Sequence, residues 1–304
     1  MTARTLSARA IAAIAVTIVL WASAYPAIRV GLRAFSPGQL AAIRFLTASL
    51  VFAIYLGVRR SRMPSGADLA RISLAGVLGI TLYNLLLNTG ELTVSAGAAS
   101  FLINCMPVFA ALLAAVFLGE RLRIAGWLGI AVSFAGVAMI AIGDSRGMHF
   151  GRGALLVLAA ALCTAIMGLL QKPLLRDYDP VALTACLMAS GELFLLPYLP
   201  AALHVAGRPE ARPALLAALF LGIGPAALGY LAWSIALESF TLSQTVSILY
   251  LIPPVAVGIS YVWIQEKTTL FTLFGGLVAV AGVVLLNRYG RPVATGRAAA
   301  PAAR

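Results

Sequence analysis

Residues 94–118 read VSAGAASFLINCMPVFAALLAAVFL, and the sequence Gly119-Glu120-Arg121 follows them directly. No charged residue interrupts this stretch, which exceeds the length of about 20 apolar residues that a helix needs to cross a bilayer. The first charges come where such a helix would reach the membrane surface. The stretch therefore predicts a transmembrane helix, the one long element that can satisfy its own backbone hydrogen bonds in lipid.

Similar apolar runs fill most of the remaining chain. The 304 residues are 62% hydrophobic and only 11% charged, with a mean hydropathy of +0.98. A soluble domain carries roughly a quarter charged residues, so this composition excludes a water-soluble fold. We predict an all-α membrane protein with about ten transmembrane helices. Besides the quoted stretch, the predicted spans are residues 11–28, 39–58, 69–88, 124–142, 153–171, 181–199, 213–236, 242–264 and 271–286.

The positive charges predict the orientation of these spans. Lys and Arg number 22 against 10 Asp and Glu, and they fall mainly in the short gaps between apolar runs. Loops on the side of the N-terminus hold about twice as many of them as the opposite loops, which places both termini in the cytoplasm. No basic run is interleaved with aromatic residues, so a nucleic-acid partner is excluded. Residues 291–304, rich in Ala, Pro and Arg, are expected to form a disordered cytoplasmic tail.

The chain contains an internal repeat. Moved by 146 positions, Pro107 falls on Pro253, Glu120 on Glu266, and Gly129 on Gly275. Residues 8–147 and 148–290 are therefore predicted to be two repeats of about five helices each. An odd number of helices inverts the second repeat in the membrane, an arrangement that many secondary transporters use around a central cavity at the midplane. A non-transporting scaffold or receptor is the remote alternative.

The first span leaves one alternative open. Its triplet Ala22-Ser23-Ala24 is compatible with the cleavage site of a signal peptide. The apolar run continues past the triplet and has a counterpart in the second repeat, which favours a permanent helix.

Four motifs carry a resemblance to a known family. They are WASAYP at 21–26, Arg44-Phe45, NCMP at 104–107 and GER at 119–121. With them the chain, from about residue 8 to 287, resembles the EamA-type branch of the drug/metabolite transporter superfamily, and is most similar to its bacterial aromatic amino-acid exporters. The resemblance implies a ten-helix exporter of metabolites in the bacterial inner membrane. The second repeat departs from the pattern, with Leu187 in place of Arg44 and Gln265 in place of Gly119.

Polar and aromatic residues within the spans predict the substrate site. An intramembrane polar group is unfavourable without partners, and residues three or four apart share a helix face. Such stripes recur at corresponding places in both repeats. We predict that they line a mostly apolar pocket with a few placed polar groups. The alternative is that they hold helices together by interhelical hydrogen bonds. The predicted substrate-binding residues are Trp21, Tyr25, Tyr83, Asn84, Phe101, Asn104, Tyr230, Ser234, Ser247 and Tyr250.

Two prolines and two ionisable residues complete the candidates. Pro107 and its repeat mate Pro253 interrupt the hydrogen bonding of matched helices, which predicts hinges. Glu192 and Arg44 lie at depth in predicted spans. A lone buried carboxylate could relay protons, so coupling through Glu192 is an alternative to mutual neutralisation.

No feature of the sequence points to an enzyme. The two histidines fall in predicted loops, and we find neither a nucleotide-binding motif nor metal-ligand spacing, so we expect no cofactor and no metal. We predict export of aromatic and other large neutral amino acids by alternating access. The alternative is a multidrug or other small-metabolite exporter. The expected partners are the small-molecule substrate and the bilayer, with the single chain as functional monomer because it contains both repeats.

Overall fold

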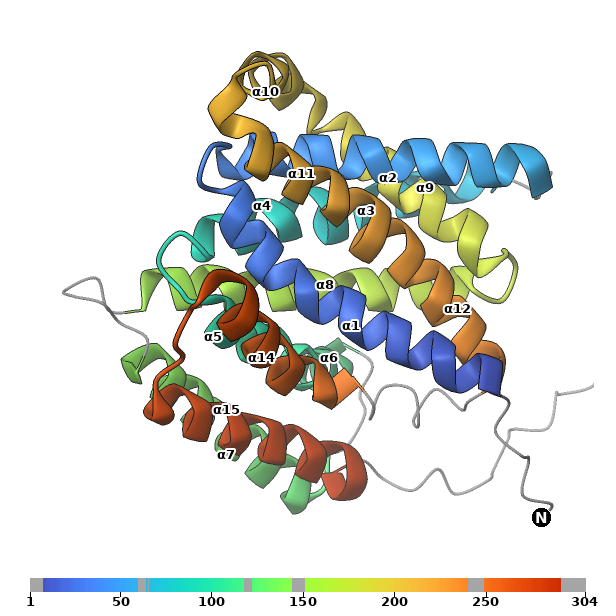
Figure 1. Ribbon diagram of the computed structural model, residues 1–304. Coiled ribbons are helices and arrows are strands. Elements are labelled where there is room, and N and C mark those ends of the chain that lie inside the picture. The colour runs from blue at the N-terminus through green and yellow to red at the C-terminus, as the bar shows by residue number, and fades with distance from the viewer. Residues whose placement is uncertain are drawn as a thin grey trace, which may run out of the picture.

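The computed structural model describes residues 8–59, 64, 66–117, 122–143, 151–239 and 249–290. Figure 1 shows that the elements in this part of the chain are helices, and no strand occurs among them. Eight of the helices are long and apolar enough to cross a membrane, or up to nine when one bent pair counts as a span. The prediction of an all-helical membrane protein is confirmed, whereas the count of ten spans remains a prediction.

The first half contains five helical segments of membrane-spanning length. Two of them are single helices, α1 (Ala8–Gly31) and α2 (Pro37–Arg59). The third runs from α3 (Leu69–Gly76) through a π-helical segment (Val77–Leu82) into α4 (Tyr83–Gly90). The fourth is α5 (Ala96–Ile103) and α6 (Met106–Phe117), and the fifth is α7 (Ile124–Gly143).

The second half follows a related order. It begins with α8 (Arg152–Leu174), continues with α9 (Pro180–Leu193) and α10 (Leu199–Ala206), and returns as α11 (Arg212–Leu221). A π-helical segment (Gly222–Leu228) joins α11 to α12 (Gly229–Ser239). The last described helices are α14 (Ile252–Ile264) and α15 (Leu270–Leu285), whose final turn, Leu286–Gly290, is also π-helical.

The seventh predicted span differs from the expected straight helix. α9 ends at Leu193, and the chain turns by 53° before the segment Leu196–Ala206. Pro197 has no N–H to bond the carbonyl of Leu193, and a proline disfavours helical geometry in the residue before it. The prediction of one helix over 181–199 was therefore wrong at its C-terminal end.

The ninth predicted span is described only in part. Residues 240–248 lie outside the described residues, and Leu249–Ile264 is an apolar helix shorter than a full span. The structure thus leaves the crossing of residues 242–264 as a prediction.

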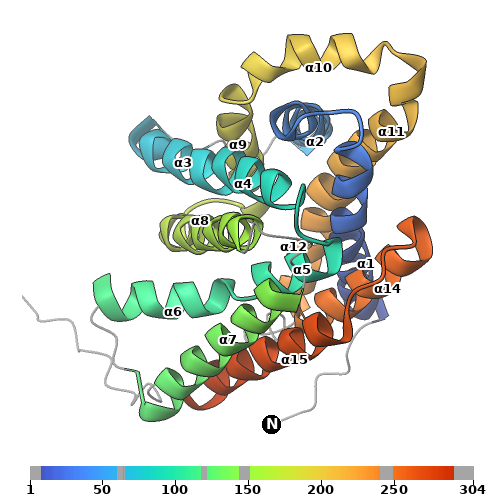
Figure 2. The same cartoon turned by 90° about the vertical axis from the view of Figure 1, so that its left-hand side faces the viewer.

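Glycines determine how closely α7 and α15 pack. These helices lie side by side in both views (Figures 1 and 2). A methyl group added at Gly136 would lie 2.5 Å from the Gly275 carbonyl oxygen, and one added at Gly282 would lie 2.5 Å from that of Gly129. Ser133 Oγ donates a hydrogen bond to the Ala279 carbonyl at 2.9 Å. Small residues allow this close backbone approach, as in other membrane helix pairs.

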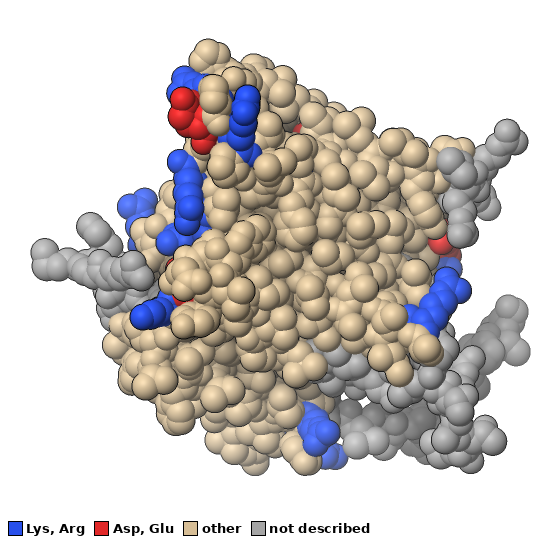
Figure 3. All heavy atoms as spheres, in the orientation of Figure 1, with Lys and Arg blue, Asp and Glu red and all other residues tan. Residues whose placement is uncertain are grey.

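The outer surface has the character of a lipid-facing surface. On the face in Figure 3, charged side chains lie at the edges and leave the middle uncharged. Many large apolar side chains of the described helices are exposed, among them Phe117, Trp127 and Leu216. Lipid tails are as apolar as these side chains, so exposure of this kind is expected in a bilayer.

Candidate functional site

Trp21 joins the two halves of the chain inside the bundle. Its ring lies 5.3 Å from that of Tyr230, edge on, and 5.4 Å from that of Trp233. Its indole Nε1 donates a hydrogen bond to the Pro225 carbonyl at 3.1 Å. Pro225 lies in the π-helical segment before α12, and Gly229 leaves space for the indole, since a methyl group there would lie 2.7 Å from Nε1. The aromatic cluster therefore depends on a local irregularity of the eighth span.

Arg44 lies among the predicted tyrosines. It is 7% exposed, and its Nη1 donates a hydrogen bond to Asn84 Oδ1 at 3.1 Å. The guanidinium also lies 5.1 Å from the centre of the Phe45 ring. Tyr25, Tyr83 and Tyr230 are close enough to Arg44 to interact with its charge. We call Trp21, Tyr25, Arg44, Tyr83, Asn84 and Tyr230 the central cluster.

Asn84 fixes the position of Arg44. It is fully buried in α4, and its Nδ2 donates to the Ile80 carbonyl at 2.7 Å, which turns its Oδ1 toward Arg44. Ile80 belongs to the π-helical segment before α4. One hydrogen-bond donor of the site is left over, because Arg44 Nε is buried and has no partner among the described residues. A buried donor of this kind is available to an anionic group of a ligand.

Three further predicted residues form contacts of other kinds. Phe101 packs its ring against Gly276 of α15. Tyr250 accepts a hydrogen bond from Asn287 and packs beside a small apolar core that contains Val108. Asn104 caps the C-terminal end of α5, and its Nδ2 donates to the Ser100 carbonyl at 3.1 Å. Phe101 belongs to the same apolar core as Tyr25, against which Trp21 and Tyr83 also pack. The place of all three residues in the substrate site stays a prediction.

Two serines cannot be placed. Ser247 lies outside the described residues, and Ser234 lies in α12 with its side chain outside them.

The two prolines lie at helix starts. Pro107 is in the first turn of α6, directly after the break at residues 104–105, and Pro253 is in the first turn of α14. The N-terminal turn tolerates proline because its N–H would be unpaired there in any case.

A signal for Arg44 is present in the sequence, but the predicted pocket did not include this residue. Arg44 is the one Lys or Arg well inside a predicted span, since Arg71 is only the third residue of the span 69–88, and such residues usually mark a functional site. The contribution of Trp233 could not be foreseen, because it depends on the π-helical geometry before α12.

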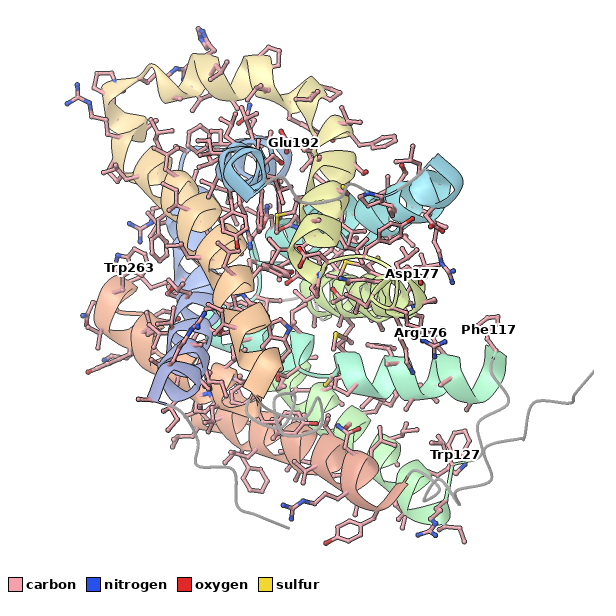
Figure 4. All side chains as sticks on the ribbon, turned by 90° about the vertical axis from the view of Figure 1, so that its right-hand side faces the viewer. Phe117, Trp127, Arg176, Asp177, Glu192 and Trp263 are labelled. Carbon is pink, nitrogen blue, oxygen red and sulfur yellow. The ribbon has the colours of Figure 1, made fainter. Side chains whose placement is uncertain are left out.

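Glu192 lies at the end of α9, near the bend (Figure 4). It is 5% exposed, and neither of its carboxylate oxygens has a partner among the described residues. It contacts no member of the central cluster through any described hydrogen bond. No group of three His, Cys, Asp or Glu that could hold a metal ion occurs in the described part of the chain.

Comparison with known proteins identifies the family. The model of the EamA-like transporter family matches residues 8–142 and again residues 151–288. The chain belongs to the EamA-like transporter family. It is thus a multi-pass membrane protein of the drug/metabolite transporter superfamily, and the family's members are transporters rather than enzymes.

Relatives of this EamA-family chain are named as exporters. It is 41% identical to a probable terminal-alkyne amino-acid exporter from Streptantibioticus cattleyicolor, over 92% of this chain and 94% of the relative. It is 26% identical to a probable amino-acid metabolite efflux pump from Salmonella typhimurium, over 90% and 92% of the two chains. A crystal structure matches its fold with a TM-score of 0.61 and 19% identity, over 92% and 96% of the two chains. The family and the two named relatives support a membrane exporter of amino acids or related metabolites, and the crystal structure shows the fold alone.

Proposed function

We propose that this protein exports amino acids with aromatic or large neutral side chains across the bacterial inner membrane. The observation that carries the proposal is the central cluster, in which aromatic rings from both halves surround a buried arginine and asparagine. Ring faces suit an apolar or aromatic side chain, and polar groups suit the charged ends of an amino acid. The names of the relatives agree with export of amino acids or their metabolites, and the preference for aromatic and large neutral side chains rests on the cluster.

Arg44 gives the cluster a positive charge that can bind the substrate carboxylate. Its Nε is an unused donor, and a guanidinium binds a carboxylate through two parallel hydrogen bonds. The phenolic oxygens of Tyr25, Tyr83 and Tyr230 can accept hydrogen bonds from the ammonium group. A cationic drug would meet the like charge of Arg44, so the cluster favours a zwitterion over a cation.

Alternating access would use the two halves as inverted repeats. Support comes from contacts that occur twice at repeat-related positions. Gly76 leaves room for the Leu187 carbonyl oxygen, because a methyl group added at Gly76 would lie 2.5 Å from that oxygen. Its repeat mate Gly222 leaves room for the Arg44 carbonyl oxygen in the same way, at 2.6 Å. Leu187 is the counterpart of Arg44. Both repeat-related spans also contain a π-helical segment, Val77–Leu82 and Gly222–Leu228. In this arrangement one chain forms the transport unit, with both termini in the cytoplasm.

Efflux from proteoliposomes tests the proposal. Vesicles containing the purified protein are loaded with radiolabelled phenylalanine, leucine, lysine or a cationic dye, with and without a pH gradient. We expect faster efflux of phenylalanine and leucine than from protein-free vesicles, and no effect on lysine or the dye. Efflux of the dye alone would favour a multidrug exporter. Dependence of efflux on the pH gradient, lost in Glu192→Gln, would favour proton coupling through Glu192.

A further inference from the structure

A polar pocket opens at the end of the bundle where α1 ends. It has a volume of about 440 Å³ and lies between the turn after α1, the loop between α4 and α5, and the loop between α14 and α15. Figure 2 shows the molecule from this end. The pocket is lined by Arg29, Leu32, Arg33, Leu92, Ile264, Gln265 and Glu266.

One ion pair connects the two halves at this pocket. Arg29 Nη2 lies 3.7 Å from Glu266 Oε1, and Arg29 Nη1 donates a hydrogen bond to the Glu91 carbonyl oxygen. The other carboxylate oxygen of Glu266 accepts a hydrogen bond at 3.1 Å from the backbone N–H of Ala96, the first residue of α5. Glu266 is therefore held as an oriented acceptor, and Arg29 remains partly open to the pocket, with its side chain 31% exposed.

Arg33 supplies an uncompensated positive charge. It is exposed and forms no ion pair with any residue that the structure describes. Glu91 lies beneath the pocket, fully buried, and its carboxylate has no partner in the described part of the chain. Burial raises the pKa of Glu91 well above its ordinary value, more than the Arg29 guanidinium lowers it. Among the residues that line the pocket, two guanidinium groups, those of Arg29 and Arg33, thus stand beside the single carboxylate of Glu266.

We propose that this pocket is a second binding site for zwitterionic amino acids, at the exit end of the transport pathway. The inference rests on the proposed export of amino acids. An amino acid has its carboxylate and ammonium on one carbon atom, so it can bind Arg33 and Arg29 with the first and Glu266 with the second. Leu32, Leu92 and Ile264 provide an apolar wall for its side chain. The carboxylate of a leaving substrate would bind Arg29, and its ammonium would bind Glu266, in place of the ion pair between these two residues. The contact between the two halves would then loosen.

The number of bound ligands tests this site. Radiolabelled L-phenylalanine is titrated against the full-length protein in nanodiscs of phosphatidylcholine, and we expect two molecules per chain. Arg33→Gln should weaken one of the two sites about tenfold or more, because it removes a charged hydrogen-bond donor. Arg33→Lys should retain much of that binding. Lys267→Gln is the matched control, since it removes a positive charge from the same end of the molecule outside the pocket, and it should still bind two molecules.

Ligand analogues distinguish the possible occupants. Phenethylamine has no carboxylate and 3-phenylpropionate has no ammonium, so neither should displace phenylalanine from the second site. A single site in the wild-type protein, or two sites of unchanged affinity in Arg33→Gln, would overturn the inference while leaving the proposed function intact. Displacement by phosphoethanolamine as strong as by phenylalanine would assign the pocket to a lipid headgroup and also overturn it. No binding at all would contradict the proposed function itself.

Discussion

At the scale of single residues, the two halves share a backbone arrangement but differ in chemistry. Arg44 and Leu187 occupy corresponding places, and each presents its carbonyl oxygen to a repeat-related glycine. Only Arg44 has a charged side chain, and Asn84 in the first half accepts its hydrogen bond. Tyr230 is the repeat mate of Asn84. At this pair of corresponding places the duplicated scaffold thus holds one charged group, which suits the binding of one substrate molecule.

The Arg44–Asn84 hydrogen bond should be measurable as a coupling between the effects of the two residues on the free energy of unfolding. Asn84→Leu leaves the Arg44 guanidinium without its acceptor, so we expect a loss of about 1–3 kcal/mol in the free energy of unfolding. Arg44→Met/Asn84→Leu should recover much of that loss, because the buried charge is gone. Both variants should lose phenylalanine binding in the central cluster. Thermal unfolding in detergent checks the stability, and a double variant less stable than Asn84→Leu would contradict the coupling.

Glu91 predicts a pH dependence of stability. Burial raises its pKa in the folded protein above the ordinary value of 4.5, so folding becomes less favourable as the pH rises above 4.5 and the unfolded carboxyl ionises. The loss grows by about 1.4 kcal/mol per pH unit until the pH reaches the raised pKa. Glu91→Gln should therefore be more stable than the wild type at pH 7, with a difference that shrinks toward pH 4. Melting temperatures over this range test it, with the exposed Glu210→Gln as a control that should show no such trend.

At the scale of helices, the close packing of α7 against α15 depends on glycines, which have no side chain to hold the two backbones apart. A methyl group at Gly136 or Gly282 would meet backbone atoms of the facing helix, which cannot rotate away as a side chain can. Gly136→Leu and Gly282→Leu should therefore force the helices apart and lower the melting temperature by several degrees. Gly168→Ala in α8 is the control, because nothing lies within 4 Å of the added methyl group and alanine favours the helix. Equal stability of Gly136→Leu and the wild type would refute this packing.

The sequence predicted helix positions better than helix shapes. Apolar runs of bilayer length located most of the described spans, and the repeated glycines marked the α7 and α15 contact. The break at residues 104–105 lies directly before Pro107, where an interruption of the helix was predicted. The bend after Leu193 and the π-helical segments were not predicted, because each depends on tertiary contacts as well as local composition. The central cluster could likewise be predicted only in part. Its aromatic residues could be named from the sequence, but the place of Arg44 beside them became clear only from its hydrogen bond with Asn84 in the structure.

At the scale of the whole molecule, the charged side chains visible in Figure 3 lie at the edges of the bundle, whereas Arg44 and Glu192 are buried within it. Figure 4 shows one end, where Arg176 and Asp177 lie in the turn between α8 and α9. The pocket lined by Arg29, Arg33 and Glu266 lies at the opposite end. This separation allows each end to be addressed by reagents that do not cross the membrane.

Labelling of single cysteines tests both the inversion and the ninth span. In a chain with Cys105, Cys163 and Cys186 replaced by Ala, cysteine is introduced at Lys267, Arg176 or Arg121, the repeat mate of Lys267. Between Arg176 and Lys267 the proposed fold crosses the membrane three times, the third time at residues 242–264. A membrane-impermeant maleimide on intact cells should therefore label Lys267→Cys, and should reach Arg176→Cys and Arg121→Cys only after permeabilisation. If residues 242–264 did not cross, all three positions would react from one side and the inverted arrangement would be refuted.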